Sequence, residues 1–143
     1  MKTPLTHHTV AAAAILGAAG LMLAASGCAH TVTTAPTTTA ATTTATVGMT
    51  NTLKFTPQTI TVHVGDTVVW KNGSDLTHTV TDVPKLASKA GDATLPKGAK
   101  SFNSGYINPG KSYSHTFTVP GTYHYFCIPH EALGMTGVVI VKP

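Results

Sequence analysis

Short runs of alternating apolar and polar residues, separated by turns, divide the chain from Thr59 to Lys142. In Thr59–Val64 every second residue is apolar, and in Ser112–Val119 every second residue is aromatic, imidazole or apolar. A period of two places these side chains on one face of a β-strand. The predicted strands are 51–55, 59–64, 67–71, 77–83, 112–119, 122–127 and 137–142. Seven or eight short strands with turns between them predict an all-β Greek-key β-sandwich.

Glycine, proline and asparagine mark the turns between these strands. The turn signals are Gly65-Asp66, Asn72-Gly73, Asn108-Pro109-Gly110 and Pro120-Gly121. Residues 85–101 show no periodicity and contain four lysines, two glycines and one proline. We expect a long surface excursion there, with room for one helical turn, and no long helix from residue 47 onwards.

The charge pattern argues against a nucleic-acid-binding function. Only 10% of the residues are charged, arginine is absent, and the formal net charge is +4. From Cys28 onwards eight lysines face five acidic residues, a surplus of +3. This surplus forms no basic stripe with interleaved aromatic residues, so nucleic acid is not an expected partner. It favours an acidic protein partner or an anionic membrane surface.

Residues 1–27 have the pattern of a bacterial lipoprotein signal peptide. Lys2 supplies a positive start, and the sixteen residues from Val10 to Ala25 are almost wholly apolar, which suits a signal better than a spanning helix. The segment ends in Ala25-Ser26-Gly27-Cys28, which resembles a lipobox. We therefore predict an exported, extracytoplasmic protein, periplasmic or on the cell surface, anchored to the membrane through lipid on Cys28. The alternative is an ordinary secretory signal with Cys28 as an incidental thiol.

Residues 28–46 are predicted to be a flexible tether that begins at the lipidated cysteine. From Ala29 to Thr46 the chain is mostly Thr and Ala, with Pro36 as its one proline. Such a segment has little apolar surface to offset the entropy that ordering it would cost. The globular domain is accordingly predicted to span residues 47–143, which is long enough to bury about two-thirds of its extended surface.

The residues that carry chemistry lie at the end of the strand 122–127. Cys127, His130 and Met135 follow one another at the spacing C-x2-H-x4-M. Thiolate and thioether sulfur stabilise Cu(I), while imidazole also accepts Cu(II), so this donor set favours copper. A second histidine is needed to complete a plane of two imidazoles and one thiolate, and His78 is the candidate.

The sequence around these donors resembles the copper-binding region of plastocyanin and pseudoazurin, which are cupredoxins, or blue copper proteins. The matching stretches are Tyr123–His130, Gly134–Gly137 and Asn72–Val80. Forty-eight residues separate His78 from Cys127, which also fits that family. The spacings within the loop match plastocyanin and pseudoazurin and differ from those of azurin and amicyanin. The resemblance covers residues 49–141.

This resemblance implies a cupredoxin-like sandwich that binds one copper ion per chain. The equatorial ligands would be His78, Cys127 and His130, and Met135 would be the axial ligand. The resemblance also implies that the N–H of Thr79, where the family often has Asn, bonds the Cys127 sulfur and tunes the site.

The family resemblance further implies a surface for redox protein partners. His130 would emerge through an apolar patch, for which the candidates are Leu76, Pro129, Ala132 and Leu133. Phe126 would point to the opposite face, at the position of a second electron entry region.

The expected function is a one-electron Cu(I)/Cu(II) shuttle between extracytoplasmic redox partners. We expect a monomer. Because four protein donors leave no open position on the metal, we expect no enzymatic activity and no small-molecule substrate. Copper delivery, storage or tolerance remains the alternative, although storage usually needs more Met or His donors. Zinc fits less well because thioether is a poor zinc ligand. A Cys-His nucleophile would lack an oxyanion site, and a metal-free adhesion sandwich would leave the loop spacing unexplained.

The remaining histidines of the domain are not assigned to the metal. His63 and His124 are predicted to face outward, and His115 shares a face with Tyr113 and Phe117, so it is expected to be packed and hydrogen-bonded. Trp70 is expected in the core.

Overall fold

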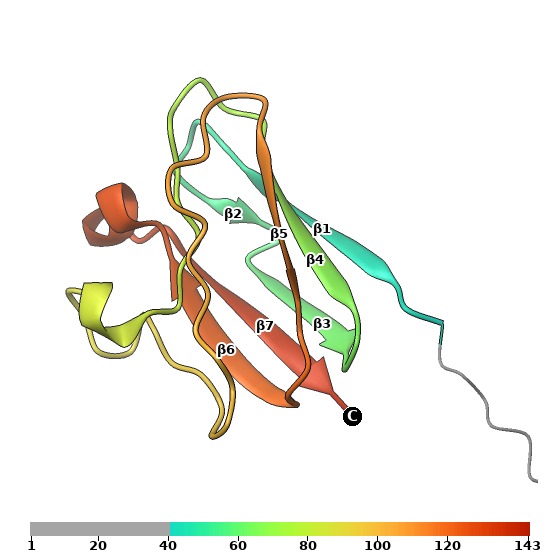
Figure 1. Cartoon of the computed structure of the whole chain (residues 1–143). Coiled ribbons are helices and arrows are strands. Elements are labelled where there is room, and N and C mark those ends of the chain that lie inside the picture. Colours follow the sequence, from blue (N-terminus) through green and yellow to red (C-terminus); the bar gives the residue numbers. More distant parts are fainter. Residues whose placement is uncertain (1–40) are drawn as a thin grey trace, which may run out of the picture. The chain divides into compact units, whose positions relative to one another are not determined.

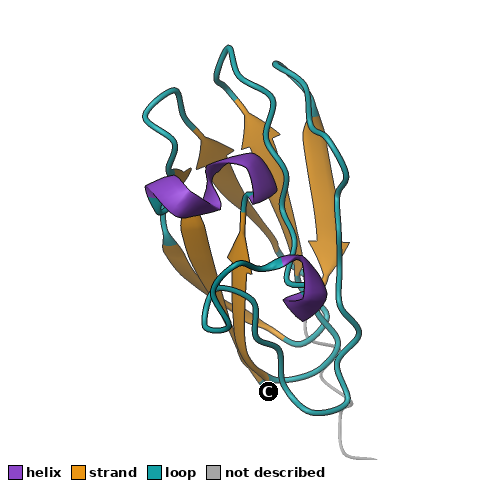
Figure 2. Cartoon of the chain, turned by 90° about the vertical axis from the view of Figure 1, so that its left-hand side faces the viewer, coloured by secondary structure: helices purple, strands orange, loops and turns teal. Residues whose placement is uncertain are grey.

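Two β-sheets make up the part of the chain that the structure, a computed structural model, describes, residues 41–143 (Figure 1). The first sheet has the strand order β2-β1-β4-β5, and the second has the order β3-β7-β6. The strands are β1 (Thr44–Met49), β2 (Phe55–Thr56), β3 (Thr59–His63), β4 (Thr67–Asn72), β5 (Ser112–Thr116), β6 (Gly121–Phe126) and β7 (Thr136–Lys142). Within residues 41–143 the helices are two short 3-10 segments, η1 (Pro84–Leu86) and η2 (Ile128–Leu133), which Figure 2 shows in front of the strands. The prediction of an all-β sandwich without a long helix is confirmed.

The predicted signal peptide of residues 1–27, the lipidation site Cys28 and the first part of the predicted tether, up to residue 40, lie outside the described residues. From residue 41 onwards, the structure contains no helix that is both long enough and apolar enough to cross a membrane.

The chain changes sheets three times as it builds the sandwich. β1 and β2 belong to the first sheet, β3 to the second, β4 and β5 to the first, and β6 and β7 to the second. As a result β1 pairs in parallel with β4, with Val47 opposite Trp70. β3 pairs in parallel with β7, with Val62 opposite Val141. Such crossings between sheets are the Greek-key connections that the turn spacing predicted.

The core between the sheets is centred on Trp70, which is fully buried as predicted. Its ring lies 5.3 Å from that of Tyr125 on the opposite sheet and 5.7 Å from that of Phe102, centroid to centroid. Aromatic rings at these distances attract one another beyond the effect of area burial. The aromatic cluster therefore holds both sheets and the long connection between β4 and β5 together.

The first strand lies earlier in the chain than the sequence predicted. The prediction placed it at residues 51–55, but the structure has β1 at Thr44–Met49, a turn at residues 50–53 and only the two-residue β2 after it. Residues 44–46, which the prediction gave to the tether, pair with residues 67–69 of β4. Threonine favours strands when a partner strand is present, and the Thr-Ala composition concealed this. The ordered domain thus begins before Val47.

The predicted strand 77–83 is also wrong, because this buried segment forms only isolated bridges. His78 pairs with Ile107, whereas Thr81 pairs with both Asn103 and Phe126. The segment therefore bonds to the long connection on one side and to β6 on the other, and it belongs to neither sheet. This position next to the end of β6 brings His78 towards the residues that follow Phe126.

Candidate metal centre

Cys127 lies immediately after β6, where the chain leaves the sheet and enters η2. The Cys127 amide donates to the carbonyl of Met135 (3.0 Å), and the Met135 amide donates to the carbonyl of His130 (3.2 Å). Gly134 ends η2 with φ +78°, a left-handed conformation that glycine adopts without strain. These backbone bonds close the loop 127–135 on itself, so the positions of its donor residues are fixed relative to one another.

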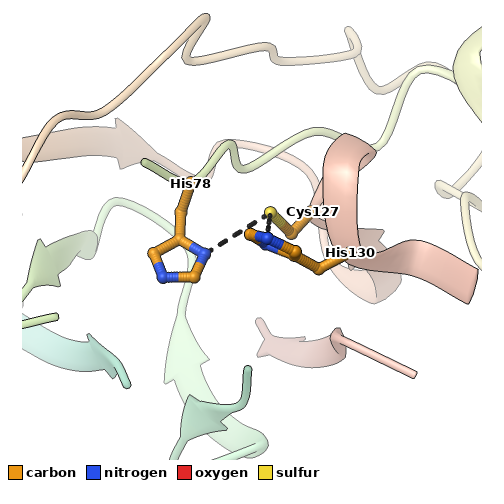
Figure 3. A group of neighbouring side chains, drawn as sticks. All are labelled: His78, Cys127 and His130. Carbon is orange, nitrogen blue, oxygen red and sulfur yellow. Dashed lines mark hydrogen bonds between the residues drawn. The ribbon is translucent and has the colours of Figure 1, made fainter. Parts of the chain in front are cut away.

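The structure brings together three of the four predicted site residues. One ligating atom from each of His78, Cys127 and His130 lies within 4.8 Å of the others. The Cys127 Sγ is 3.6 Å from Nδ1 of His78 and 3.3 Å from Nδ1 of His130 (Figure 3). His78 and Cys127 are fully buried, and His130 is partly exposed. A thiol and two imidazoles that face one another are the equatorial donor set of a blue-copper site.

Met135, the fourth predicted residue, is fully buried at the end of the same loop. It belongs to the hydrophobic cluster that also contains Cys127. The backbone bonds of Met135 to Cys127 and His130 hold it beside the three converging donors.

Ser74 determines which nitrogen of His78 faces the thiol. The Ser74 Oγ lies 2.7 Å from Oδ1 of Asn72 and 2.8 Å from Nε2 of His78. A hydroxyl has one proton, and the Asn72 oxygen can only accept it. Ser74 Oγ therefore accepts a hydrogen bond from His78 Nε2–H. This tautomer leaves the lone pair on Nδ1, which is the atom that faces Cys127.

Asn72 organises the loop that carries Ser74 and His78. Its Nδ2 donates to the carbonyls of Leu76 (2.7 Å) and Ile107 (2.9 Å), and its Oδ1 accepts from the Ser74 amide (3.0 Å). The sequence predicted only a turn at Asn72-Gly73. The polar neighbours Asn72 and Ser74, shortly before a predicted ligand, were the signal that could have indicated a supporting network.

Thr79 supports the Cys127 sulfur, as the family resemblance implied. Its N–H donates to the Cys127 Sγ at 3.3 Å. Its hydroxyl also accepts from the N–H of Ile128 at 2.8 Å. Thr79 thus holds both the thiol and the residue that follows it, and this second contact was not predicted.

Burial sets the protonation of the donors. Desolvation raises the pKa of the Cys127 thiol, although the N–H of Thr79 acts in the opposite direction. Desolvation, followed by the nearby His130, lowers the pKa of His78. Without metal, the pocket therefore favours a neutral thiol and a neutral imidazole, and a cation that binds there displaces the thiol proton.

Comparison with known proteins identifies the site. A family model described as copper binding proteins, plastocyanin/azurin family, matches residues 41–142. The chain belongs to this family. It is a blue copper protein with the cupredoxin fold, and its buried thiol, imidazole and thioether donors suit copper.

The curated proteins to which the chain is similar include plastocyanins. The chain is 37% identical over 92 residues to plastocyanin of Scenedesmus fuscus, covering 63% of this chain and 88% of that protein. It is 38% identical over 91 residues to a chloroplastic plastocyanin of Tetradesmus obliquus, covering 63% of this chain and 59% of that protein. The chain thus spans most of the first relative and somewhat over half of the second.

Solved structures similar to this one include amicyanins of the same fold. An oxidized amicyanin variant has a TM-score of 0.54 and 32% identity, over 68% of this chain and 81% of that chain. The reduced Cu(I) form of another amicyanin variant has a TM-score of 0.54 and 32% identity, over 69% and 82%. The predicted cupredoxin-like fold is therefore confirmed.

Phe126 was predicted to point to the opposite face, at the position of a second electron entry region. Its side chain is fully buried, so the structure offers no exposed aromatic surface at this position. The backbones of Thr81 and Thr94 pair with those of Phe126 and His124, so the segment after His78 runs along β6.

The other histidines lie as predicted, apart from one unconfirmed contact. His63 is exposed and His124 partly exposed. His115 packs against Phe102 and Phe117, with ring centroids at 4.6 and 4.8 Å. The hydrogen bond that was expected for His115 is not among the contacts of the described residues, so that part stays a prediction.

Proposed function

We propose that the protein is a one-electron carrier whose copper ion is bound by His78, Cys127, His130 and Met135. The observation that supports this most strongly is the convergence of one thiol and one nitrogen from each of two imidazoles within 4.8 Å, with His78 and Cys127 buried. Copper held there would supply a Cu(I)/Cu(II) couple. Met135 would complete the set from the end of the same loop.

The chain's contribution is to keep these donors in one arrangement. Ser74 orients His78, Thr79 holds the Cys127 sulfur, and the bonds within loop 127–135 fix His130 and Met135. A donor set that is held by the surrounding structure moves little when the charge of the ion changes, and a small rearrangement permits fast electron transfer. Four protein donors leave no place for a substrate, so we propose a carrier and not an enzyme.

We propose the surface around His130 as the docking site for redox proteins. Leu76 and Leu133 are 42% and 63% exposed, and Pro129 and Ala132 are also exposed. His130 is the most accessible of the three converging donors, so this surface offers the shortest route to the metal. A small apolar patch suits weak and short-lived encounters.

We also propose that the protein works outside the cytoplasm, anchored by lipid on Cys28. The support is the signal-like sequence of residues 1–27 and the small residues before Cys28. Labelling cells with a fatty-acid analogue tests the anchor. The wild type should take up label that the Cys28→Ser variant lacks, and an unlabelled wild type would contradict the anchor.

Copper delivery is the competing function, since the same donors could transfer the metal in place of an electron. Two rates separate the functions: electron self-exchange of the copper-loaded protein, and loss of copper to a chelator. An electron carrier should show fast self-exchange and slow copper loss. Slow self-exchange with rapid copper loss would contradict the proposal and favour delivery.

A further inference from the structure

Glu131 is a buried acid directly beside a proposed copper ligand. It follows His130 in η2 and is only 3% exposed. It is also the one buried residue of η2. A carboxylate that is removed from water is destabilised by several kcal/mol unless hydrogen bonds compensate it. Its burial therefore needs partners from another part of the fold.

These partners are backbone amides of the segment that follows η1. Ser88 N–H lies 2.9 Å from both carboxylate oxygens of Glu131, and Lys89 N–H lies 3.0 Å from Oε1. The Glu131 carboxylate is thus held by two backbone amides that lie 42 and 43 residues earlier in the chain.

η2 needs such an external anchor more than a longer helix would. A 3-10 helix has poor hydrogen-bond geometry and is stable only in short pieces. Other distant residues also form hydrogen bonds with η2 and its cap. The Thr79 hydroxyl accepts from the N–H of Ile128, the first residue of η2, at 2.8 Å, and the Lys54 ammonium donates to the carbonyl of Gly134 at 3.4 Å on the exposed surface. Thr79 thus holds the first residue of η2, whereas the three contacts of Glu131 hold the residue directly after His130.

We propose that Glu131 is a positioning residue of the metal centre, whose carboxylate anchors η2 to the backbone of Ser88 and Lys89 and so holds His130 against Cys127. The proposal rests on the proposed role of His130 as a copper ligand. Glu131 does not touch the metal. It acts through the backbone, because a fixed side chain at position 131 fixes the orientation of the preceding residue in the same helical turn.

The Glu131→Gln variant tests this role in the full-length protein. Gln keeps the size of the side chain but replaces one acceptor oxygen with an NH2 group, and because both oxygens of Glu131 contact the Ser88 amide, that amide then faces another donor. We expect copper loss to a chelator to become about 10-fold faster, the range in which supporting residues of metal sites act. We also expect a shift of the Cu(II) visible and electron paramagnetic resonance spectra. In the copper-free protein, the Ser88 and Lys89 amides should exchange hydrogen faster.

Asp66 offers a matched control at the other end of the sandwich. It is 5% exposed, and its carboxylate accepts the backbone N–H groups of Thr43 (2.7 Å) and His63 (2.8 Å). It lies in the turn before β4, whereas Ser74 and His78 follow the far end of that strand. The Asp66→Asn variant should lose stability but retain the wild-type copper-loss rate and spectra.

The Ser88→Pro variant removes the backbone N–H donor and leaves the Glu131 carboxylate intact. It replaces Glu131→Gln as the test if that variant does not fold. Ala87 already has φ −82° and ψ 134°, which a following proline permits. This variant should reproduce the faster copper loss and the spectral shift. The proposal is overturned if Glu131→Gln loses stability, as Asp66→Asn does, but keeps the wild-type rate of copper loss and the wild-type spectra. The same outcome for Ser88→Pro overturns it if Glu131→Gln does not fold. A wild type that binds no copper would instead contradict the proposed function.

Discussion

At the scale of single residues, the hydroxyl of Ser74 has a defined task. It has one proton, which goes to Asn72, so it must accept from Nε2 of His78. This contact keeps the lone pair of His78 on Nδ1, on the side of Cys127. Partners that orient a ligating imidazole in this way contribute strongly to metal affinity.

Replacing Ser74 with Ala should therefore weaken copper binding. Without its acceptor, His78 can place its proton on either nitrogen or rotate, and we expect an affinity loss of about 10-fold. Competition with a chelator of known copper affinity measures this. Ser104→Ala is the control, because the Ser104 hydroxyl accepts the Val80 amide at 2.8 Å and does not contact a predicted ligand. Equal affinities of the two variants would mean that Ser74 has only a structural role.

The sequence identified the donors but not the residues that support them. Cys127, His130 and Met135 are rare, reactive residue types at a short spacing, so their chemistry is visible in the sequence. Ser74 and Glu131 are common residue types, and the contacts of Glu131 reach Ser88 across 43 positions. Only the fold shows that these side chains converge on the site.

At the scale of secondary-structure elements, the pairing of β6 with β7 depends on a glycine. Gly137 lies opposite Tyr125, and a Cβ atom at position 137 would occupy the space of the Tyr125 ring. Tyr125 is fully buried and packs against Trp70, so it has little freedom to move aside.

Gly137→Ala should consequently destabilise the domain by about 1–3 kcal/mol, the usual cost of overpacking a core. For a domain of this size each kcal/mol lowers the melting temperature by roughly 4–8 °C. Thermal unfolding measures the change. Gly91→Ala is the control, because a Cβ there meets no atom within 4 Å. A Gly137→Ala protein as stable as the control would show that β6 and β7 tolerate a wider separation.

The sequence predicted those elements whose burial alternates and missed those that depend on distant partners. β3, β4, β6 and β7 lie within one residue of the predicted strands, and β5 starts as predicted but ends at Thr116, three residues early. β1 was missed because its Thr-Ala start looks unstructured without β4 beside it. Residues 77–83 were assigned to a strand because they are rich in Thr and Val, which favour strands, but the segment pairs only at isolated bridges.

At the scale of the whole molecule, one buried acid links stability to pH. Asp82 is fully buried, and its Oδ1 accepts the Phe102 amide at 2.7 Å. Its Oδ2 has no hydrogen-bond partner within residues 41–143. Desolvation raises the pKa of Asp82 from 3.8 to about 6. The folded state therefore favours the neutral carboxyl.

The folded state binds this proton more tightly than the unfolded state does. The stability that Asp82 contributes is therefore complete below pH 3.8 and is lost as the pH rises through about 6. The full loss is about 3 kcal/mol. Denaturant unfolding of copper-free wild type and Asp82→Asn at several pH values measures it. The stability of Asp82→Asn relative to wild type should increase between pH 4 and about 7. Taking this difference cancels the opposite contribution of His115, whose pKa is lowered by burial. If the difference in stability between Asp82→Asn and wild type does not change with pH, the raised pKa of Asp82 is contradicted.

The central claim is that the Cys127 thiolate binds copper together with His78, His130 and Met135. The visible spectrum of the Cu(II)-loaded protein, recorded with a metal assay, tests it most directly. The wild type should bind one copper ion per chain and be intensely coloured by charge transfer from the thiolate. His115→Ala should keep this colour, and Cys127→Ser should lose it. A colourless copper complex of the wild type, or a colour that persists in Cys127→Ser, would contradict the account.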